Sequence, residues 1–420
     1  MDQIYTYRDG RIRSPWLKAF NHAGAALERV GLRASLDPDA VVAAAAREAG
    51  SSDLGGESYR EPLEQYVAAL EEEASVSTLG RLAIRKILVA QLAHRIRLHA
   101  WTQAHPEAAE EKIRQPWVIV GLPRTGTTLL SMLLALDPNA RALLQWETRS
   151  SVPPPTLATA HTDPRIAECE KQTDGLHALN PALRAMHPFG ATLPEECVPF
   201  MMLDLRTLGM ETQARVPGYG RWLNGCDMAP AYVQHKKALQ ALQVGQPTER
   251  WVLKTPNHLW CLETLLDFYP DARIIWTHRD PGPVTASVTS LNATLQGVFA
   301  RRLDPQQLGR DWLTKLQTGI ERGVAFDDQA QAQGRTDWCF HLQYSDLMRD
   351  PTHALRRLYA HFGEEPSPLH ERRVESWLRE KPQNEFGRHG YDPTDFGWSY
   401  EELAEAWQPY RERYGIEREK

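Results

Sequence analysis

The sequence is poor in cysteine and has no long apolar segment. Only five of its 420 residues are cysteine, and no two of them form a C-x-x-C pair. This pattern argues against a disulfide scaffold or a zinc ribbon and fits a reducing compartment. Apolar runs such as residues 129–136 are much shorter than the roughly 20 residues that span a bilayer. The N-terminus has no apolar signal-peptide core. We therefore expect a cytoplasmic protein without a membrane span.

The chain also lacks an excess of positive charge. Its 48 basic and 54 acidic side chains give a formal net charge of −6, so no overall field attracts nucleic acid. Hydrophobic residues make up 42% and charged residues 24%, which is typical of globular domains and unlike disordered or coiled-coil chains. A nucleic-acid partner is not expected, but local basic groups can still bind a small anion.

Two patterns of periodicity divide the chain. Apolar residues recur at helical spacing over residues 14–30, 59–74 and 78–102, which predicts a helical N-terminal extension over residues 1–113. After it, helical segments alternate with strands predicted at 116–120, 142–146, 251–254, 273–278 and 338–343. This alternation predicts an α/β fold over residues 114–420, with a mainly parallel sheet covered on both faces. Residues of about 150–235 interrupt the rhythm and are interpreted as an inserted region.

A glycine-containing loop at residues 120–128 connects the first predicted strand to a helix. Gly121 and Gly126 permit a tight turn, and the free amides of the following helix can hold a phosphate-like anion. The two glycines have P-loop spacing, but Thr127 stands where nucleotide-hydrolysing loops have lysine, and the positive charge lies at Arg124. The pattern predicts a P-loop-type three-layer sandwich that binds an anion, and it disfavours ordinary nucleotide hydrolysis.

This loop resembles the 5′-phosphosulfate loop of the sulfotransferases that use 3′-phosphoadenosine 5′-phosphosulfate (PAPS), in the form of the bacterial and tyrosylprotein branches. The residues that carry the likeness are Arg124, Thr125, Gly126, Thr127 and Thr128. Arg279 and Ser287 are eight residues apart, like the arginine and serine that grip the 3′-phosphate in this family. Residues 344–351 resemble the family segment Y-x-D-L-x-x-D-P, which implies that Tyr344 lies near the adenine. The resemblance spans residues of about 115–400.

Sulfuryl transfer needs a base for the proton of the acceptor and cations for the leaving phosphate. Lys254 ends the predicted strand 251–254 and resembles the lysine that stabilises the transition state in the family. Arg124 supplies a second positive charge. Glu147 resembles the base in the E-T-R segment of tyrosylprotein sulfotransferases. The sequence leaves other candidates for the base open, namely His187, Glu195, Glu196 and His258.

The resemblance implies an enzyme that moves the sulfuryl group of PAPS to a hydroxyl of a small-molecule or lipid-like acceptor bound by the inserted region. The alternatives are a P-loop nucleotide kinase, which the missing lysine disfavours, and a non-catalytic sulfonucleotide-binding protein. No metal site is expected, because the chain has no H-E-x-x-H motif and no regular Cys/His ligand spacing. No segment predicts a particular oligomeric state.

Overall fold

The computed structural model describes residues 4–10, 14–380 and 388–419. At its centre lies a five-stranded sheet in the order β3-β4-β2-β5-β6, and all of its neighbouring strands are parallel. Its strands are β2 (Trp117–Gly121), β3 (Ala140–Ala142), β4 (Arg250–Lys254), β5 (Arg273–His278) and β6 (Cys339–Gln343). The predicted parallel sheet and α/β class are therefore confirmed.

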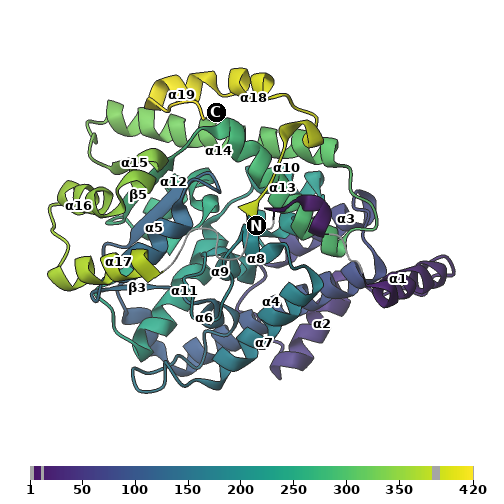
Figure 1. Cartoon of the computed structure of the whole chain (residues 1–420). Coiled ribbons are helices and arrows are strands. Elements are labelled where there is room, and N and C mark those ends of the chain that lie inside the picture. Colours follow the sequence, from purple (N-terminus) through teal and green to yellow (C-terminus); the bar gives the residue numbers. More distant parts are fainter. Residues whose placement is uncertain (1–3, 11–13, 381–387, 420) are drawn as a thin grey trace.

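Helices surround this sheet (Figure 1). The first four are α1 (Pro15–Glu28), α2 (Pro38–Ala49), α3 (Arg60–Glu72) and α4 (Thr78–Ala104). The helices between β2 and β4 are α5 (Thr127–Leu134), α6 (Gln145–Arg149), α7 (Pro164–Leu179), α8 (Leu183–Met186), α9 (Val198–Met201), α10 (Pro217–Gly225) and α11 (Ala229–Gly245). The others are α12 (Leu262–Phe268), α13 (Pro281–Phe299), α14 (Pro305–Ala332), α15 (Tyr344–Arg349), α16 (Pro351–His361), α17 (Pro368–Glu380), α18 (Tyr400–Ala406) and α19 (Gln408–Tyr414). Within the described ranges, no helix is both long enough and apolar enough to cross a bilayer.

The two faces of the sheet bury different apolar side chains. Trp117 and Ile119 of β2 join a core with α5 and α16, whereas Val118 and Val120 join a larger core with α11 and α14. Successive residues of a strand point to opposite faces, so a strand covered on both sides needs apolar residues at every position. All five residues of β2 are buried. The helix–sheet–helix layering follows from this uninterrupted apolar run.

The prediction of a strand over residues 142–146 is wrong, because β3 ends at Ala142 and helix α6 begins at Gln145. The backbone N–H of Leu144 donates to Oε2 of Glu147 over 3.1 Å. This bond satisfies a free amide at the start of the helix, as a capping box does. Glu147 therefore lies in the first turn of a helix and not at the end of a strand.

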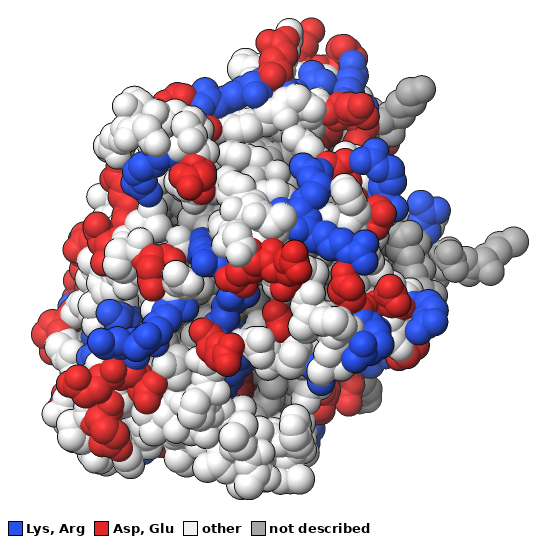
Figure 2. Space-filling model, turned by 90° about the vertical axis from the view of Figure 1, so that its left-hand side faces the viewer, with Lys and Arg blue, Asp and Glu red and all other residues white. Residues whose placement is uncertain are grey.

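The four N-terminal helices confirm the helical pattern of the first hundred residues, and α2, α3 and α4 share the larger core with the sheet. Arg95 of α4 forms a buried ion pair with Asp204, with 2.5 Å between Nη1 and Oδ2. Helix α1 projects from the body (Figure 1) and exposes Trp16, Phe20 and Leu27. Figure 2 shows acidic and basic side chains interspersed over one face of the molecule, which agrees with the small net charge.

A short parallel ladder pairs strands from two distant parts of the chain. It consists of β1 (Ile4–Tyr5) and β7 (Arg388–His389). The 3-10 helix η1 (Tyr7–Gly10) follows β1 and packs against α13. His389 Nε2 lies 2.9 Å from the hydroxyl of Ser290, which is also on α13. The ladder therefore holds residues 388–391 beside the helix that follows β5.

Candidate active site

The loop between β2 and α5 lies at the carboxyl end of the central strand. Gly121, Arg124 and Gly126 have φ angles of 137°, 70° and 85°. Glycine adopts such angles freely, whereas for an arginine they are uncommon and mark a local constraint. The hydroxyl of Thr125 donates to the carbonyl of Leu122 over 2.7 Å and holds the turn closed. Helix α5 begins directly after Gly126, so its free N-terminal amides face the loop.

Arg124 extends its side chain from this loop toward α13. Its Nε donates to the hydroxyl of Ser287 over 3.3 Å, and its Nη1 donates to the carbonyl of Met186 over 2.5 Å. Burial lowers the pKa of this guanidinium, and the nearby charge of Arg279 acts in the same direction. Among the residues that the structure describes, none forms an ion pair with Arg124. A buried cation without a counter-charge is costly, so the arrangement suits a bound anion.

Arg279 follows β5 and lies against the same loop. Its Nη1 donates to the carbonyl of Arg124 over 2.9 Å, and its guanidinium lies 4.3 Å from the ring centre of Tyr344. Its Nε and Nη2 donate to the two carboxylate oxygens of Glu419 over 2.7 and 2.8 Å. Although burial opposes the charge, hydrogen bonds to this carboxylate raise the pKa of Arg279. A guanidinium that binds a carboxylate through two parallel bonds can bind a phosphate in the same way.

Lys254 approaches the loop from the end of β4. Its side chain is 2% exposed, and its Nζ lies 3.0 Å from Oε1 of Glu196. The same Nζ lies 3.5 Å from the hydroxyl of Thr128 in the first turn of α5. Lys254 therefore stands between the anion loop and Glu196. This places a carboxylate from the inserted region next to the cation that the sequence predicted to stabilise the leaving group.

Two further candidates for the base belong to the same part of the inserted region. Burial, followed by the positive charge of Lys254, lowers the pKa of His187 to about 4, so its imidazole is neutral near pH 7. Burial raises the pKa of Glu195, and its Oε1 accepts the N–H of Glu196 over 2.8 Å. Together with Glu196, these two residues place three of the five candidate bases near Lys254.

Glu147 and His258 have other partners. Oε1 of Glu147 accepts Nη2 of Arg141 over 2.6 Å, and its other oxygen caps α6. His258 is fully buried, its Nδ1 lies 2.7 Å from the hydroxyl of Tyr232, and burial lowers its pKa far below the usual range. Neither side chain contacts the loop or the ammonium of Lys254 in the part of the chain that the structure describes.

Sequence reasoning missed the partner of Arg279. Glu419 lies 140 positions away along the chain and belongs to no motif, so only the folded arrangement of residues 388–419 could identify it. The carbonyl of Met186 as an acceptor for Arg124 is missed for a similar reason. A backbone carbonyl leaves no signal in side-chain patterns.

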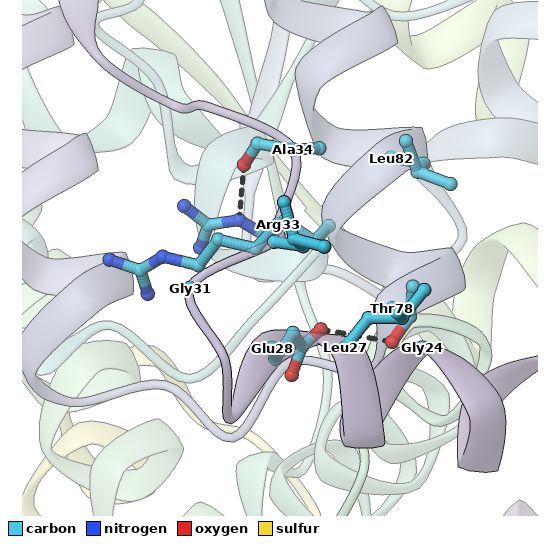
Figure 3. Close-up of a pocket in the computed structure, with 10 residues that line it drawn as sticks. Gly24, Leu27, Glu28, Gly31, Arg33, Ala34, Thr78 and Leu82 are labelled. Atoms are coloured by element: carbon cyan, nitrogen blue, oxygen red, sulfur yellow. Dashed lines mark hydrogen bonds between the residues drawn. The ribbon is translucent and has the colours of Figure 1, made fainter.

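A surface pocket of about 350 Å³ lies elsewhere, between α1, residues 31–34 and the start of α4 (Figure 3). The hydroxyl of Thr78 donates to Glu28 over 2.9 Å at its rim, and Nε of Arg81 donates to the carbonyl of Ala34 over 2.6 Å. None of the residues predicted to bind the sulfonucleotide lines this pocket. It is therefore separate from the candidate active site.

Comparison with known proteins agrees with the resemblance to sulfotransferases. Residues 116–368 match the model of the sulfotransferase family. The chain is 27% identical over 320 residues to the ω-hydroxy-β-dihydromenaquinone-9 sulfotransferases Stf3 of Mycobacterium bovis and Mycobacterium tuberculosis, covering 74% of this chain and 78% of each relative. Its structure resembles the crystal structure of sulfotransferase STF9 from Mycobacterium avium, with a TM-score of 0.82, 31% identity, and 90% of this chain and 97% of that chain covered. For sulfotransferase STF1 from Mycobacterium tuberculosis the TM-score is 0.79 and the identity 29%, over 88% of this chain and 98% of that one.

Proposed function

Because this chain belongs to the sulfotransferase family, we propose that it transfers the sulfuryl group of PAPS to a hydroxyl group of a lipid-like acceptor. The observation that carries the proposal is the convergence of Arg124, Arg279 and Lys254 at the amino end of α5. Three cations beside a helix N-terminus suit a ligand with several phosphate and sulfate oxygens. The contact between Glu419 and Arg279 supports this proposal, because the two carboxylate oxygens bind the guanidinium as the oxygens of a phosphate would.

Each of these residues has a distinct role in binding the donor PAPS. Arg124 and the amides around Thr125, Gly126, Thr127 and Thr128 hold the 5′-phosphosulfate. Arg279 and Ser287 hold the 3′-phosphate, and Tyr344, whose ring lies against Arg279, borders the adenine. The hydrogen bond from Arg124 to Ser287 joins the two groups of residues into one continuous surface.

Glu196 acts as the base in this proposal, in place of Glu147. Its carboxylate lies 3.0 Å from Nζ of Lys254, and the same Nζ lies 3.5 Å from the hydroxyl of Thr128. It takes the proton of the acceptor hydroxyl while the acceptor oxygen forms a bond to sulfur and the bond between sulfur and the phosphate oxygen breaks. Lys254 and Arg124 neutralise the charge that grows on the leaving phosphate. The reacting atoms need no metal ion, because these two side chains supply the positive charge.

Two observations support a lipid-like acceptor, one from a relative and one from this chain. The mycobacterial relative is named for a hydroxylated menaquinone, which is an apolar molecule with a hydroxyl group. Helix α1 presents the exposed side chains of Trp16, Phe20 and Leu27 on a projecting element. Exposed aromatic and aliphatic side chains of this kind suit contact with a lipid surface. The chemical class proposed is therefore a lipid alcohol.

A screen with ³⁵S-labelled PAPS tests the proposal. The full chain is incubated with a polyprenyl alcohol in detergent, a soluble phenol or a sugar, and the label in each acceptor is counted. We expect label in the polyprenyl alcohol and loss of this label in Arg124→Ala. Label in the phenol or sugar alone would refute the acceptor class. Tight PAPS binding without transfer to any acceptor would favour a non-catalytic binding protein, and phosphate transfer from Mg-ATP would favour a kinase.

A further inference from the structure

Three metal-ligating side chains from separate segments meet inside the core. They are Cys197, which follows the Glu195–Glu196 pair, His235 of α11 and His258 of the 3-10 helix η5 (Pro256–Trp260). All three are 0% exposed. One ligand atom of each lies within 4.8 Å of the ligand atoms of the other two. This cluster plays no part in the transfer reaction described above.

The hydrogen bonds around His258 are compatible with a proton on Nδ1. The thiol of Cys261 donates to the carbonyl of Asn257 over 3.2 Å, and a carbonyl can only accept. The sulfur of Cys261 is therefore free to accept the hydroxyl proton of Tyr232, 3.5 Å away. In that arrangement the oxygen of Tyr232 accepts Nδ1–H of His258 over 2.7 Å, and Nε2 of His258 carries a lone pair.

Both histidines therefore direct an unused nitrogen into the interior. Nδ1 of His235 lies 2.8 Å from the hydroxyl of Tyr269, so this ring is held in the same manner as His258. Nε2 of His235 and Nε2 of His258 are buried and have no hydrogen-bond partner. Leaving a buried polar atom unpaired costs about 1–3 kcal/mol.

We propose that Cys197, His235 and His258 bind a zinc ion. Zinc takes imidazole nitrogen at about 2.0–2.1 Å and thiolate sulfur at about 2.3 Å in a tetrahedral arrangement, so two ligand atoms of one ion are about 3.3–3.6 Å apart. Ligand atoms that lie within 4.8 Å of one another reach this geometry when the side chains move together by about 1 Å. A thiolate with two imidazoles suits zinc and not magnesium or calcium. Tyr232 and Tyr269 hold the outer nitrogens of the rings, as partners of metal-bound histidines usually do.

The site would connect the segments that carry the proposed catalytic residues. Cys197 is adjacent to Glu196 in the sequence, and its N–H donates to the carbonyl of Lys254 over 2.8 Å. His258 follows Lys254 by four residues. A zinc ion would therefore fix both segments to α11 and stabilise the fold without touching the reacting atoms. Sequence spacing did not predict it, because the ligands are 38 and 23 residues apart (235 − 197 and 258 − 235).

Metal content tests this site independently of any transferase activity. The full chain, purified without a histidine tag, is stripped with a chelator, incubated with excess zinc, desalted and analysed by plasma mass spectrometry. We expect about one zinc per chain in the wild type and roughly tenfold less in Cys197→Ala. Cys339→Ala is the matched control, because Cys339 is also a buried free cysteine but lies outside the cluster. It should retain the zinc.

Cobalt gives a second measurement that does not require a folded Cys197 variant. The wild-type chain loaded with Co²⁺ should show a thiolate-to-cobalt charge-transfer band, and Cys339→Ala should keep that band. If Cys197→Ala does not fold, Cys197→Ser replaces it. A wild-type chain that binds no zinc, or zinc that remains in a folded Cys197 variant, would overturn the proposal. Neither result would affect the proposed sulfuryl transfer, because the readout is the metal alone.

Discussion

Glutamine substitutions at Glu147 and Glu196 should produce opposite effects, because the structure gives these two carboxylates different surroundings. The side chain of Glu147 is 2% exposed and is held by Arg141 and by the backbone of Leu144. The side chain of Glu196 is 22% exposed and contacts the ammonium of Lys254 beside the anion loop. Glutamine keeps the shape of each side chain but removes its charge and its ability to take a proton.

The expected magnitudes follow from these contacts. Glu147→Gln breaks a buried ion pair, which costs about 3–5 kcal/mol when one partner is lost. Arg141 keeps its bonds to the carbonyls of Leu242 and Gln246, so a loss near 3 kcal/mol of unfolding free energy is expected. Glu196→Gln removes the counter-charge of the buried ammonium of Lys254, but its own carboxylate is partly exposed, so a cost of about 1–3 kcal/mol is expected, between that of an exposed and that of a buried pair. Its turnover should fall about 10²–10⁴-fold, as for loss of a general base.

Two measurements on each variant separate the effects. Urea denaturation gives the free energy of unfolding, and transfer from saturating ³⁵S-labelled PAPS gives turnover per folded molecule. Glu147→Gln should be the less stable of the two but active, and Glu196→Gln should be nearly inactive per folded molecule. Normal turnover in Glu196→Gln together with lost turnover in a stable Glu147→Gln would refute the reasoning. Normal turnover in Glu196→Gln and lost turnover in a variant of Glu195 or His187 would move the role of base to that residue.

Three substitutions test the proposed donor site. Arg124→Ala should weaken binding of 3′-phosphoadenosine 5′-phosphate by about 1.5–3 kcal/mol, because a charge-assisted contact is lost; unchanged affinity in calorimetry would contradict the loop assignment. Arg279→Ala should weaken binding of the same ligand much more than binding of adenosine 5′-phosphate, and equal losses would show that Arg279 does not contact the 3′ group. Glu419→Gln should bind the 3′-phosphorylated ligand several-fold more tightly, because a competing carboxylate worth up to about 1 kcal/mol is removed. Glu401→Gln, which alters the exposed pair with Arg418, is the control and should leave this affinity unchanged.

Local sequence patterns were sufficient for four of the five strands of the sheet and for the residues around the loop. Arg124 and Arg279 each follow a short apolar strand and Lys254 ends one, and the carboxyl ends of parallel strands meet at one edge of a sheet. Their proximity could therefore be predicted from strand positions alone. The spacing of Arg279 and Ser287 added the first residues of α13 to the same edge.

The remaining features depend on contacts that no local pattern contains. Residues 142–146 have the composition of a strand, yet the bond from Leu144 to Glu147 starts a helix there. Glu147 therefore lies in the first turn of α6 and pairs with Arg141. The approach of Glu196 to Lys254 depends on the path of the inserted region, whose Pro-rich sequence does not define a path. The ion pair of Arg279 with Glu419, and the cluster around Cys197, join segments that are distant in the sequence.

The most direct test of the proposed function is product analysis by mass spectrometry of one reaction containing PAPS, a polyprenyl alcohol and the full chain. The account predicts one molecule of 3′-phosphoadenosine 5′-phosphate for each molecule of sulfated alcohol. It also predicts that Lys254→Ala lowers the rate of both products about 10²–10³-fold, as for loss of one group that stabilises the transition state. Formation of 3′-phosphoadenosine 5′-phosphate without a sulfated alcohol, or an equal rate in Lys254→Ala, would contradict it.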